Sequence, residues 1–398
     1  MVGAHYAAGV TSRTRIGFDA DVLLAAATAA ATAPTAATAP TAATAPTAPI
    51  GRGDGARGGA ARGTGGGAGT APRRELARAY RELSERYRGG SDTPEDARLT
   101  DGHVRAYLAA RLPATLAVSR VVLAELADRR PHWQPHSLLD LGAGPGPATW
   151  AALEVFGEIT GVDLVERSAR MIAAGRGLAR LGAPGPLRTG ARWHHTTAQV
   201  PPVGVAADLT VASYLLGELP AATRGPAVAA WWRATTGALV IVDTGTPDGY
   251  ARILAARSAL LADGATITAP CPSDGACPLP DGDWCHFARR VERSAVHRAL
   301  KDAERGHEDE KFAYLIASRG QPAHAPGRLL RAPRAHAGHI RLALCVPEGQ
   351  REAVVARSRR DAYAWARRAR WGDPAPGSVT DPAAPTDPAA GGQAPRTV

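Results

Sequence analysis

The sequence predicts an α/β protein with a doubly wound, mostly parallel sheet. Short apolar runs near residues 137, 158, 207 and 238 alternate with stretches of helical periodicity. A glycine-rich turn follows the first run and opens a helix, and acidic side chains follow the second. Strands that alternate with helices in this way form a parallel sheet whose ligand lies at the carboxyl ends of the strands.

Composition limits the folded part of the chain to about residues 73–372. The 398 residues are 45% hydrophobic, which is enough for a full core. Residues 1–72 are rich in Ala, Thr, Pro and Gly, with near-copies TAPTAA, TAPTAA and TAPTAP at 32–49, and residues 373–398 are similar. Segments so poor in large apolar side chains cannot offset their ordering entropy, so both are expected to be disordered.

No segment is expected to leave the cytoplasm or enter a membrane. The apolar stretch 22–33 resembles the core of an export signal, but Asp19 and Asp21 directly before it argue against that role. No run approaches the eighteen or so apolar residues of a membrane span. A cytoplasmic protein is therefore the expectation.

Helices are predicted before the sheet, over residues 73–135. Leu76, Tyr80, Leu83 and Tyr87 lie at helical spacing within 72–88 and form one packing face. A second helical stretch spans about 103–128, and Pro113 should kink or divide it.

The glycine-rich turn belongs to a predicted cofactor domain at 136–268. Asp140, Gly142, Gly144 and Gly146 form a D-x-G-x-G-x-G pattern, which lets the backbone turn tightly and approach a ligand. A dinucleotide fingerprint would need glycine at the next position, and this chain has Pro147. The spacing favours S-adenosylmethionine over NAD and a Rossmann-like, class I methyltransferase fold.

Further cofactor contacts are predicted at the ends of later strands. Glu166, twenty residues after Gly146, fits a partner for ribose hydroxyls, and Asp163 is the competing candidate. Asp208 opens the fourth expected strand, and Ser213 begins the loop that should border the ligand. Residues 213–219 lack the acidic or Asn residue followed by Pro-Pro-aromatic of exocyclic-amine methyltransferases, so no catalytic residue is assigned.

All four cysteines lie in the region 269–372, which is expected to form a separate metal-binding and basic unit. Cys271, Cys277 and Cys285 lie within fifteen residues, and Cys345 follows after a gap of fifty-nine. Clustered cysteines in a reducing compartment indicate metal ligands rather than disulfides. The spacing leaves iron–sulfur and zinc equally open, because the paired C-x-x-C hairpins of zinc sites are missing.

The same region carries the excess positive charge of the chain. From His286 to Gly372 there are 17 Arg and 2 Lys against 9 Asp and Glu, which equals the whole-chain excess of +10. A folded basic region indicates a polyanionic partner, most often nucleic acid. The alternative is a merely solvated basic face.

Several motifs together resemble a known family. Three segments are similar to the methyltransferase-like small ribosomal subunit assembly family. They are 277–319, which includes CPLP, DWCHFARRVERS and EDEKFAYL, then 328–345, and AYLAARLPAT at 106–115. The resemblance covers about residues 75–372. It implies a methyltransferase fold that acts on the small ribosomal subunit and its rRNA, monomeric away from the ribosome.

The resemblance also implies site residues. Cys271, Cys277, Cys285 and Cys345 would hold a 4Fe-4S cluster, and Asp140 to Gly146 with Glu166 would hold S-adenosylmethionine. Two departures lie near the expected cofactor pocket. Gly217 stands where the family usually has Asn, and residues 243–247 read Asp-Thr-Gly-Thr-Pro instead of an acidic-Pro-Gly-Thr-Pro run.

Residues 286–301 are expected to form a helix beside Cys285. Four arginines should lie near one face of that helix and meet rRNA phosphates: Arg289, Arg290, Arg293 and Arg298. Two functions stay open, an rRNA methyltransferase and an assembly factor with a vestigial cofactor pocket. A zinc-stabilised methyltransferase of another substrate and a radical enzyme are further alternatives.

Overall fold

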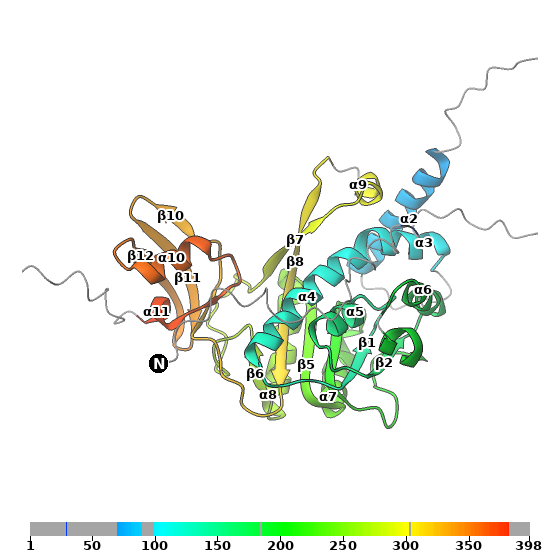
Figure 1. The fold of residues 1–398 in the computed structure, drawn as a ribbon, viewed down its shortest axis with the longest axis horizontal. Helices are drawn as coiled ribbons and strands as arrows, with labels where there is room; N and C mark the ends of the chain where they lie inside the picture. Colours follow the sequence, from blue (N-terminus) through cyan, green and yellow to red (C-terminus); the bar gives the residue numbers. More distant parts are fainter. Residues whose placement is uncertain (1–28, 30–69, 90–98, 184, 302–303, 382–398) are drawn as a thin grey trace, which may run out of the picture.

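The computed structural model describes residue 29 and residues 70–89, 99–183, 185–301 and 304–381. Most of residues 1–72 and 382–398, for which disorder is predicted, lie outside the described part. Two sheets organise the described residues, an eight-stranded mixed sheet and a five-stranded antiparallel sheet (Figure 1). The small sheet lies to one side of the large one.

The large sheet has the topology predicted from the sequence. Its strands are β1 (Ser137–Leu141), β2 (Gly161–Glu166), β3 (Arg192–His195), β4 (Ala207–Ser213), β5 (Thr235–Thr244), β6 (Thr266–Ala269), β7 (Phe287–Glu292) and β8 (His307–Ser318). Their order is β3-β2-β1-β4-β5-β8-β6, and β7 pairs with β8. Strands β1 to β5 run parallel, while β8 is antiparallel to β5 and β6. This is the class I methyltransferase fold, with the strand order reversing between β1 and β4.

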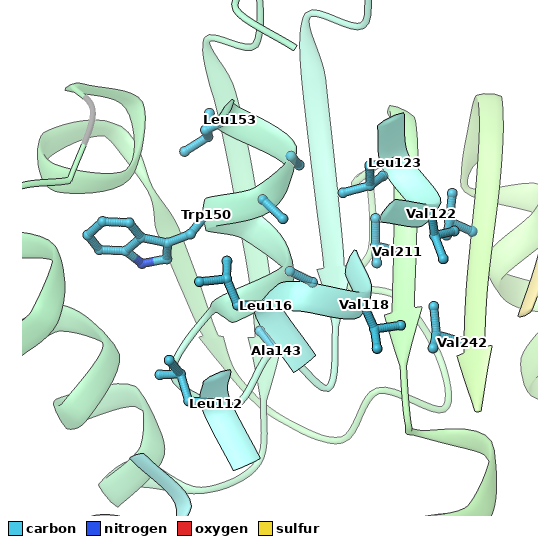
Figure 2. Packing of buried hydrophobic residues seen from close by; sticks show 14 of the residues in the cluster. Leu112, Leu116, Val118, Val122, Leu123, Ala143, Trp150, Leu153, Val211 and Val242 are labelled. Atoms are coloured by element: carbon cyan, nitrogen blue, oxygen red, sulfur yellow. The ribbon is translucent and has the colours of Figure 1, made fainter. Parts of the chain in front are cut away.

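Helices cover both faces of the large sheet. They are α5 (Pro147–Val155), α6 (Ala169–Arg180), α7 (Ala221–Arg233) and α8 (Pro247–Ala262), with short turns at Pro186–Gly190 and Leu216–Glu218. Because side chains alternate along a strand, Leu138 joins one core and Leu139 the other. In the first core the N-terminal helix α4 (Leu112–Arg129) packs on α5 around Trp150 and meets the sheet at Val211 and Val242 (Figure 2).

The N-terminal helices follow the predicted pattern. They are α2 (Thr70–Gly89), α3 (Asp101–Ala106), a π-helical turn at Tyr107–Arg111 and α4 (Leu112–Arg129). Pro113 lies in the first turn of α4, directly after the π-helical turn. The missing N–H of proline and its clash with the preceding turn explain why the helix, continuous over Asp101–Arg129, widens into a π-helical turn there instead of dividing.

The stretch Asp101–Arg129 is long and apolar enough to cross a membrane by length and composition, although no such segment is predicted from the sequence. Of its most apolar window, 67% is buried inside the fold. One helix of this kind is weak evidence for a membrane span, since the core helix of a soluble protein meets the same criteria.

Strand β8 corrects the predicted domain boundary. Its first half pairs with β7, and its second half lies between β5 and β6. A short helix, α9 (Ala295–Lys301), lies at the outer end of the β7–β8 hairpin and approaches α2 (Figure 1). The chain after residue 268 therefore completes the large sheet instead of starting a separate unit there.

The small sheet forms the C-terminal part. Its elements are β9 (Gly327–Leu329), β10 (Arg334–His336), β11 (His339–Val346), β12 (Gly349–Ala356), α10 (Arg360–Arg368), β13 (Pro374–Ala375) and α11 (Gly377–Thr380). Residues 373–381 were predicted to be disordered, and the structure contradicts this. Strand β13 pairs with β9, and Val379 is buried in the core of the small sheet, which supplies the apolar burial that composition alone does not reveal.

Candidate functional site

The glycine loop lies between β1 and α5 and has the conformation that its sequence predicts. Gly142, Gly144 and Gly146 have φ values of 66°, 55° and 91°, in the left-handed region that favours glycine. Gly146 caps α5, whose first residue is Pro147. The loop therefore presents backbone at the carboxyl end of β1, beside the switch point of the sheet.

Asp140 supports the loop from inside the fold. Its carboxylate is buried and accepts hydrogen bonds from Thr149 N at 3.1 Å and Thr149 Oγ1 at 2.6 Å. Burial raises the pKa of Asp140 to about 6, although the Thr149 hydrogen bonds lower it. The side chain ties β1 to α5, so its part in any cofactor site is to position the loop.

Glu166 lies at the end of β2, beside the loop. Its Oε2 accepts a hydrogen bond from Gly144 N at 2.8 Å, and its Oε1 accepts one from Ser168 N at 2.7 Å. The competing candidate, Asp163, lies three residues earlier in the strand and pairs with Arg192 and His194. The structure places Glu166, and not Asp163, at the edge where ribose hydroxyls are expected.

Asp208 is not part of this edge, which corrects the prediction. It opens β4 at the amino end of the sheet, and its carboxylate accepts hydrogen bonds from the backbone N–H groups of His136 and Ser137. Thr236 Oγ1 donates a third hydrogen bond. A residue at the start of a parallel strand lies at the end opposite the ligand edge.

Ser213 closes β4 at the ligand edge. Its Oγ is buried and has no hydrogen-bond partner among the described residues. A buried hydroxyl in that state is an available contact for a ligand. Tyr214 follows with a φ of 58°, and its N–H donates to Val242 O at 2.7 Å.

Two tyrosines lie at this edge: Tyr214, in the loop after β4 that was expected to border the ligand, and Tyr107, which was not predicted. Tyr107, from the π-helical turn, lies with its Oη 3.4 Å from where a Cβ on Gly144 would be. Tyr214 donates from its Oη to Glu310 Oε1 at 3.5 Å. Tyr107 belongs to the AYLAARLPAT motif, whose resemblance to the family was the available signal for this position.

The departures at Gly217 and 243–247 meet at one ion pair. Arg252 donates from Nε to Asp243 Oδ2 at 2.8 Å and from Nη2 to Asp243 Oδ1 at 2.7 Å. A Cβ on Gly217 would lie 3.2 Å from Arg252 Nη2, so the glycine leaves room for this pair. Thr246 caps α8, with its Oγ1 accepting from Gly249 N at 3.1 Å.

The four cysteines lie around one cavity where the two sheets meet. Cys271, Cys277 and Cys285 come from the loop between β6 and β7, and Cys345 comes from β11 of the small sheet. The cavity has a volume of about 60 Å³, and all four thiols are free and half-buried. Among the described residues, no group of three or more His, Cys, Asp or Glu side chains is placed to hold a single metal ion.

The chemistry of these donors fits a thiolate-bound cationic group. Burial raises the pKa of Cys271, of Cys285 and of Cys345, the last to about 12, and neighbouring thiols raise each further. Buried thiols that lie side by side ionise together only when positive charge lies between them. Arg257 and Arg328 also line the cavity and lower the pKa of Cys271.

The two arginines hold the cavity walls. Arg257 donates from Nη2 to the carbonyl oxygens of Ser273 at 2.9 Å and Gly275 at 2.6 Å, within the cysteine loop. Arg328, which pairs in register with Cys345, donates from Nε to Pro270 O at 2.9 Å. The cysteine loop is therefore fixed to helix α8 on one side and to the small sheet on the other.

The predicted arginine-bearing helix is wrong over residues 286–294. Residues 287–292 form β7, because β8 supplies an antiparallel partner that outweighs helical periodicity. Neighbouring side chains of a strand point to opposite faces, so Arg289 and Arg290 do not share one. Arg290 pairs with Asp309, and Arg293 pairs with Glu308, while Arg298 lies exposed on α9.

Comparisons with known proteins agree with the sequence motifs. Residues 102–376 match the family described as Mitochondrial small ribosomal subunit Rsm22. The human mitochondrial ribosome assembly protein METTL17 is 31% identical over 292 residues, which are 69% of this chain and 62% of that protein. The mitochondrial Rsm22-cox11 tandem protein 2 of Schizosaccharomyces pombe is 24% identical over 331 residues, 69% of this chain and 43% of that protein. This chain thus spans less than two thirds of either relative.

Solved structures share the fold only distantly. Magnesium protoporphyrin IX methyltransferase of Synechocystis with bound S-adenosylmethionine is 13% identical, covers 63% of this chain and 96% of its own, and has a TM-score of 0.34. An O-methyltransferase family protein of Burkholderia thailandensis is 14% identical, covers 63% and 72%, and has a TM-score of 0.38. Likeness at this level carries no argument about activity.

Proposed function

The chain belongs to the Rsm22 family, and from this premise we propose that it is an assembly factor that binds the small ribosomal subunit. The family match includes both sheets and the cysteine cavity. METTL17, the relative named above as a ribosome assembly protein, supports the same role. The cytoplasmic location and monomeric state expected from the sequence remain part of this proposal.

The observation that carries the proposal is the convergence of four cysteines from two sheets on one cavity. We propose that Cys271, Cys277, Cys285 and Cys345 hold an iron–sulfur cluster. Tetrahedral zinc, with Zn–S bonds of about 2.3 Å, needs its thiolates about 3.8 Å apart. The four cysteines line one cavity, and an iron–sulfur cluster would place each of their thiolates on a separate iron.

The proposed role of this site is structural. An iron–sulfur cluster, when bound, supplies bonds that join the cysteine loop to the small sheet. Arg328 and Arg257 orient the walls of the cavity and offset the negative charge of the thiolates. The small sheet would then be held in a defined orientation against the large one, with its basic residues in place for the subunit.

We also propose that S-adenosylmethionine binds at the carboxyl edge of the large sheet. Three observations support this: the left-handed glycines of the loop, the position of Glu166 and the unpaired hydroxyl of Ser213. Backbone N–H groups at the start of α5 and hydroxyls around them would bind the cofactor. The pocket would help to order the edge whether or not a methyl group is transferred.

An rRNA methyltransferase is the second candidate, favoured by Glu218. Burial raises the pKa of this carboxyl to about 7, although Arg167 at 3.6 Å lowers it. A carboxyl with that pKa at the ligand edge could accept a proton from a methylated amine. We favour the assembly factor for two reasons. The segment after β4 lacks the acidic or Asn residue followed by Pro-Pro-aromatic of exocyclic-amine methyltransferases, and the carboxylate of Asp243 is paired with Arg252.

Two measurements on the full chain test the proposal. Anaerobically purified protein should contain iron and sulfide in matching amounts, and stoichiometric zinc without sulfide would replace the cluster by a zinc site. The protein should also sediment with immature small subunits and not with mature ones. Failure of the wild-type protein to sediment with either would overturn the assembly role.

A variant at the cofactor edge separates the two functions. Glu166→Ala removes the carboxylate beside Gly144 and should abolish S-adenosylmethionine binding, measured by calorimetry. An assembly factor should still sediment with immature subunits, while a methyltransferase should lose transfer of labelled methyl groups to their rRNA. Arg176→Gln, at an exposed position on α6, is the matched control for surface substitution.

A further inference from the structure

The β10–β11 hairpin aligns two pairs of basic side chains on one face of the small sheet. Arg334 lies directly opposite Arg341, and His336 lies directly opposite His339. Paired residues share a face, and so do residues two apart in a strand, so all four lie together. Ile340 points the other way, into the core, with 2% of its surface exposed. We call the surface formed by five residues the outer face: Arg334, His336, His339, Arg341 and Val354.

The arginine pair is an unfavourable arrangement for an isolated protein. Like charges directly opposite each other in a sheet destabilise it. Apart from the backbone ladder, the guanidinium groups of Arg334 and Arg341 have no hydrogen bond or ion pair to another of the described residues. The nearest acid on the outer strands, Glu352, lies two residue pairs further along the same face, opposite Ala343, and forms no ion pair with either arginine among the described residues. A bound anion between the two guanidinium groups would relieve their repulsion.

The histidine pair adds flat rings beside these charges. The two imidazoles stack with centroids 4.9 Å apart and planes 9° apart. His336 is exposed and His339 is half-buried, at a turn where Gly338 has a φ of 80°. On the other side of Arg341, Val354 is directly opposite and 55% exposed. Exposed rings and an apolar side chain among arginines form the stacking platform that unpaired bases use.

The β7–β8 hairpin lacks this combination. Arg290 and Asp309 pair at 3.0 Å, and Arg293 and Glu308 pair at 2.9 Å. Both arginines are therefore neutralised within the fold. The uncompensated charge of the outer face makes it the better contact for a polyanion.

We propose that the outer face binds single-stranded RNA, with Arg334 and Arg341 on phosphates and the imidazole pair against a base. This rests on the proposed function, since the immature small subunit would supply the RNA. Along β11 the same face reaches Cys345 four residues after Arg341, about 14 Å away. The cysteine cavity would therefore set the position of the RNA contact relative to the large sheet.

Binding of a labelled oligoadenylate of about 12 nucleotides, followed by fluorescence anisotropy, tests the proposal. Arg334→Gln with Arg341→Gln removes two phosphate contacts and should reduce the slope of log affinity against log salt by about 1.4. Between about 50 and 200 mM salt the wild type should then lose about sevenfold more affinity than the variant. His336→Ala with His339→Ala should weaken binding at least about fivefold with the slope unchanged.

The controls separate this surface from general charge. Arg176→Gln with Arg180→Gln removes the same charge from α6 and should leave the salt slope within error of the wild type. His336→Tyr with His339→Tyr should restore affinity by keeping aromatic rings. An unchanged slope in the Arg334/Arg341 variant, or equal affinity for a duplex of the same length, would overturn the proposal.

Failure of this surface and failure of the proposed function give different results. Outer-face variants that sediment with immature subunits and bind oligoadenylate like the wild type exclude the surface and leave the assembly role intact. A wild type that binds oligoadenylate through the outer face but never sediments with subunits supports the surface and overturns the assembly role.

Discussion

Replacing Glu125 should show how much the buried ion pair between α4 and the small sheet contributes to the free energy of unfolding. Arg328 is 2% exposed, and it donates from Nη1 to Glu125 Oε2 at 3.1 Å and from Nη2 to Glu125 Oε1. Tyr314 Oη also donates to Glu125, at 2.6 Å. Glu125→Leu leaves the guanidinium buried and unpaired, and removing one partner of such a pair costs about 3–5 kcal/mol.

Urea unfolding followed by near-ultraviolet circular dichroism measures this cost. With an m value of about 3 kcal/mol/M, the midpoint should fall by roughly 1–1.7 M. Arg328→Met should cost less, because Glu125 keeps Arg129 at 3.7 Å. The double variant should recover much of the loss, since an apolar pair can replace a buried ion pair.

A partly exposed ion pair between α4 and α5 is the control. Arg120 Nε lies 2.6 Å from Glu154 Oε2, with both side chains partly exposed. Arg120→Met should cost at most about 1 kcal/mol. If Glu125→Leu costs no more than this control, or if the two single-variant costs simply add in the double variant, the buried pair does not act as argued.

Acid should weaken the same contact. Burial raises the pKa of Glu125, but the charge and hydrogen bonds of Arg328 lower it more, so the pKa lies below the ordinary value of 4.5. A carboxyl with a lowered pKa stabilises the fold fully above its unfolded value and loses that contribution as the pH falls below it. The stability difference between wild type and Glu125→Leu should therefore shrink below about pH 4.5, as urea titrations at several pH values would show.

Three further changes have defined outcomes. Burial raises the pKa of Asp140 to about 6, and only its ionised form is penalised. Asp140→Asn should therefore be more stable than the wild type by up to about 3 kcal/mol near pH 8, and the difference should be gone near pH 4. A pH-independent difference in urea midpoint contradicts this. Burial raises the pKa of Glu308, but its hydrogen bonds with His297, Lys301 and Arg293 lower that pKa more, so the carboxylate anchors α9. Glu308→Gln should therefore release α9, which would be seen as faster hydrogen exchange in 295–301 at neutral pH. Unchanged exchange argues against that anchor. Cys345→Ser should lose bound iron and increase exchange in the small sheet, while Tyr250→Phe, which removes only the 3.1 Å contact from Oη to Cys277, should keep the iron.

Local sequence signals predicted the elements whose causes are local. The glycines at 142, 144 and 146 each needed a left-handed backbone, and the structure has one at each. Pro113 directly follows a π-helical turn within one continuous helix, a local irregularity of the kind that proline causes. Strands β1, β2, β4 and β5 were recognisable as short apolar runs because parallel strands are buried on both faces.

Predictions failed where a distant partner decided the outcome. Residues 286–294 have helical periodicity but form a strand because β8 pairs with them. Asp208 looked like a ligand contact, yet its place at the beginning of β4 puts it at the far end of the sheet. Residues 373–381 are poor in apolar side chains and are nevertheless ordered against β9.

The sequence by itself therefore determined the family and the class I methyltransferase fold. It also grouped the four cysteines as one candidate set of metal ligands. Only the tertiary structure decided that these cysteines surround one cavity between two sheets, that Arg290 and Arg293 are neutralised, and that Arg334 faces Arg341 unpaired. Motifs and periodicity report what a residue does with its neighbours in the chain. Register, charge pairing and cavity walls depend on residues up to two hundred positions apart, as with Glu125 and Arg328.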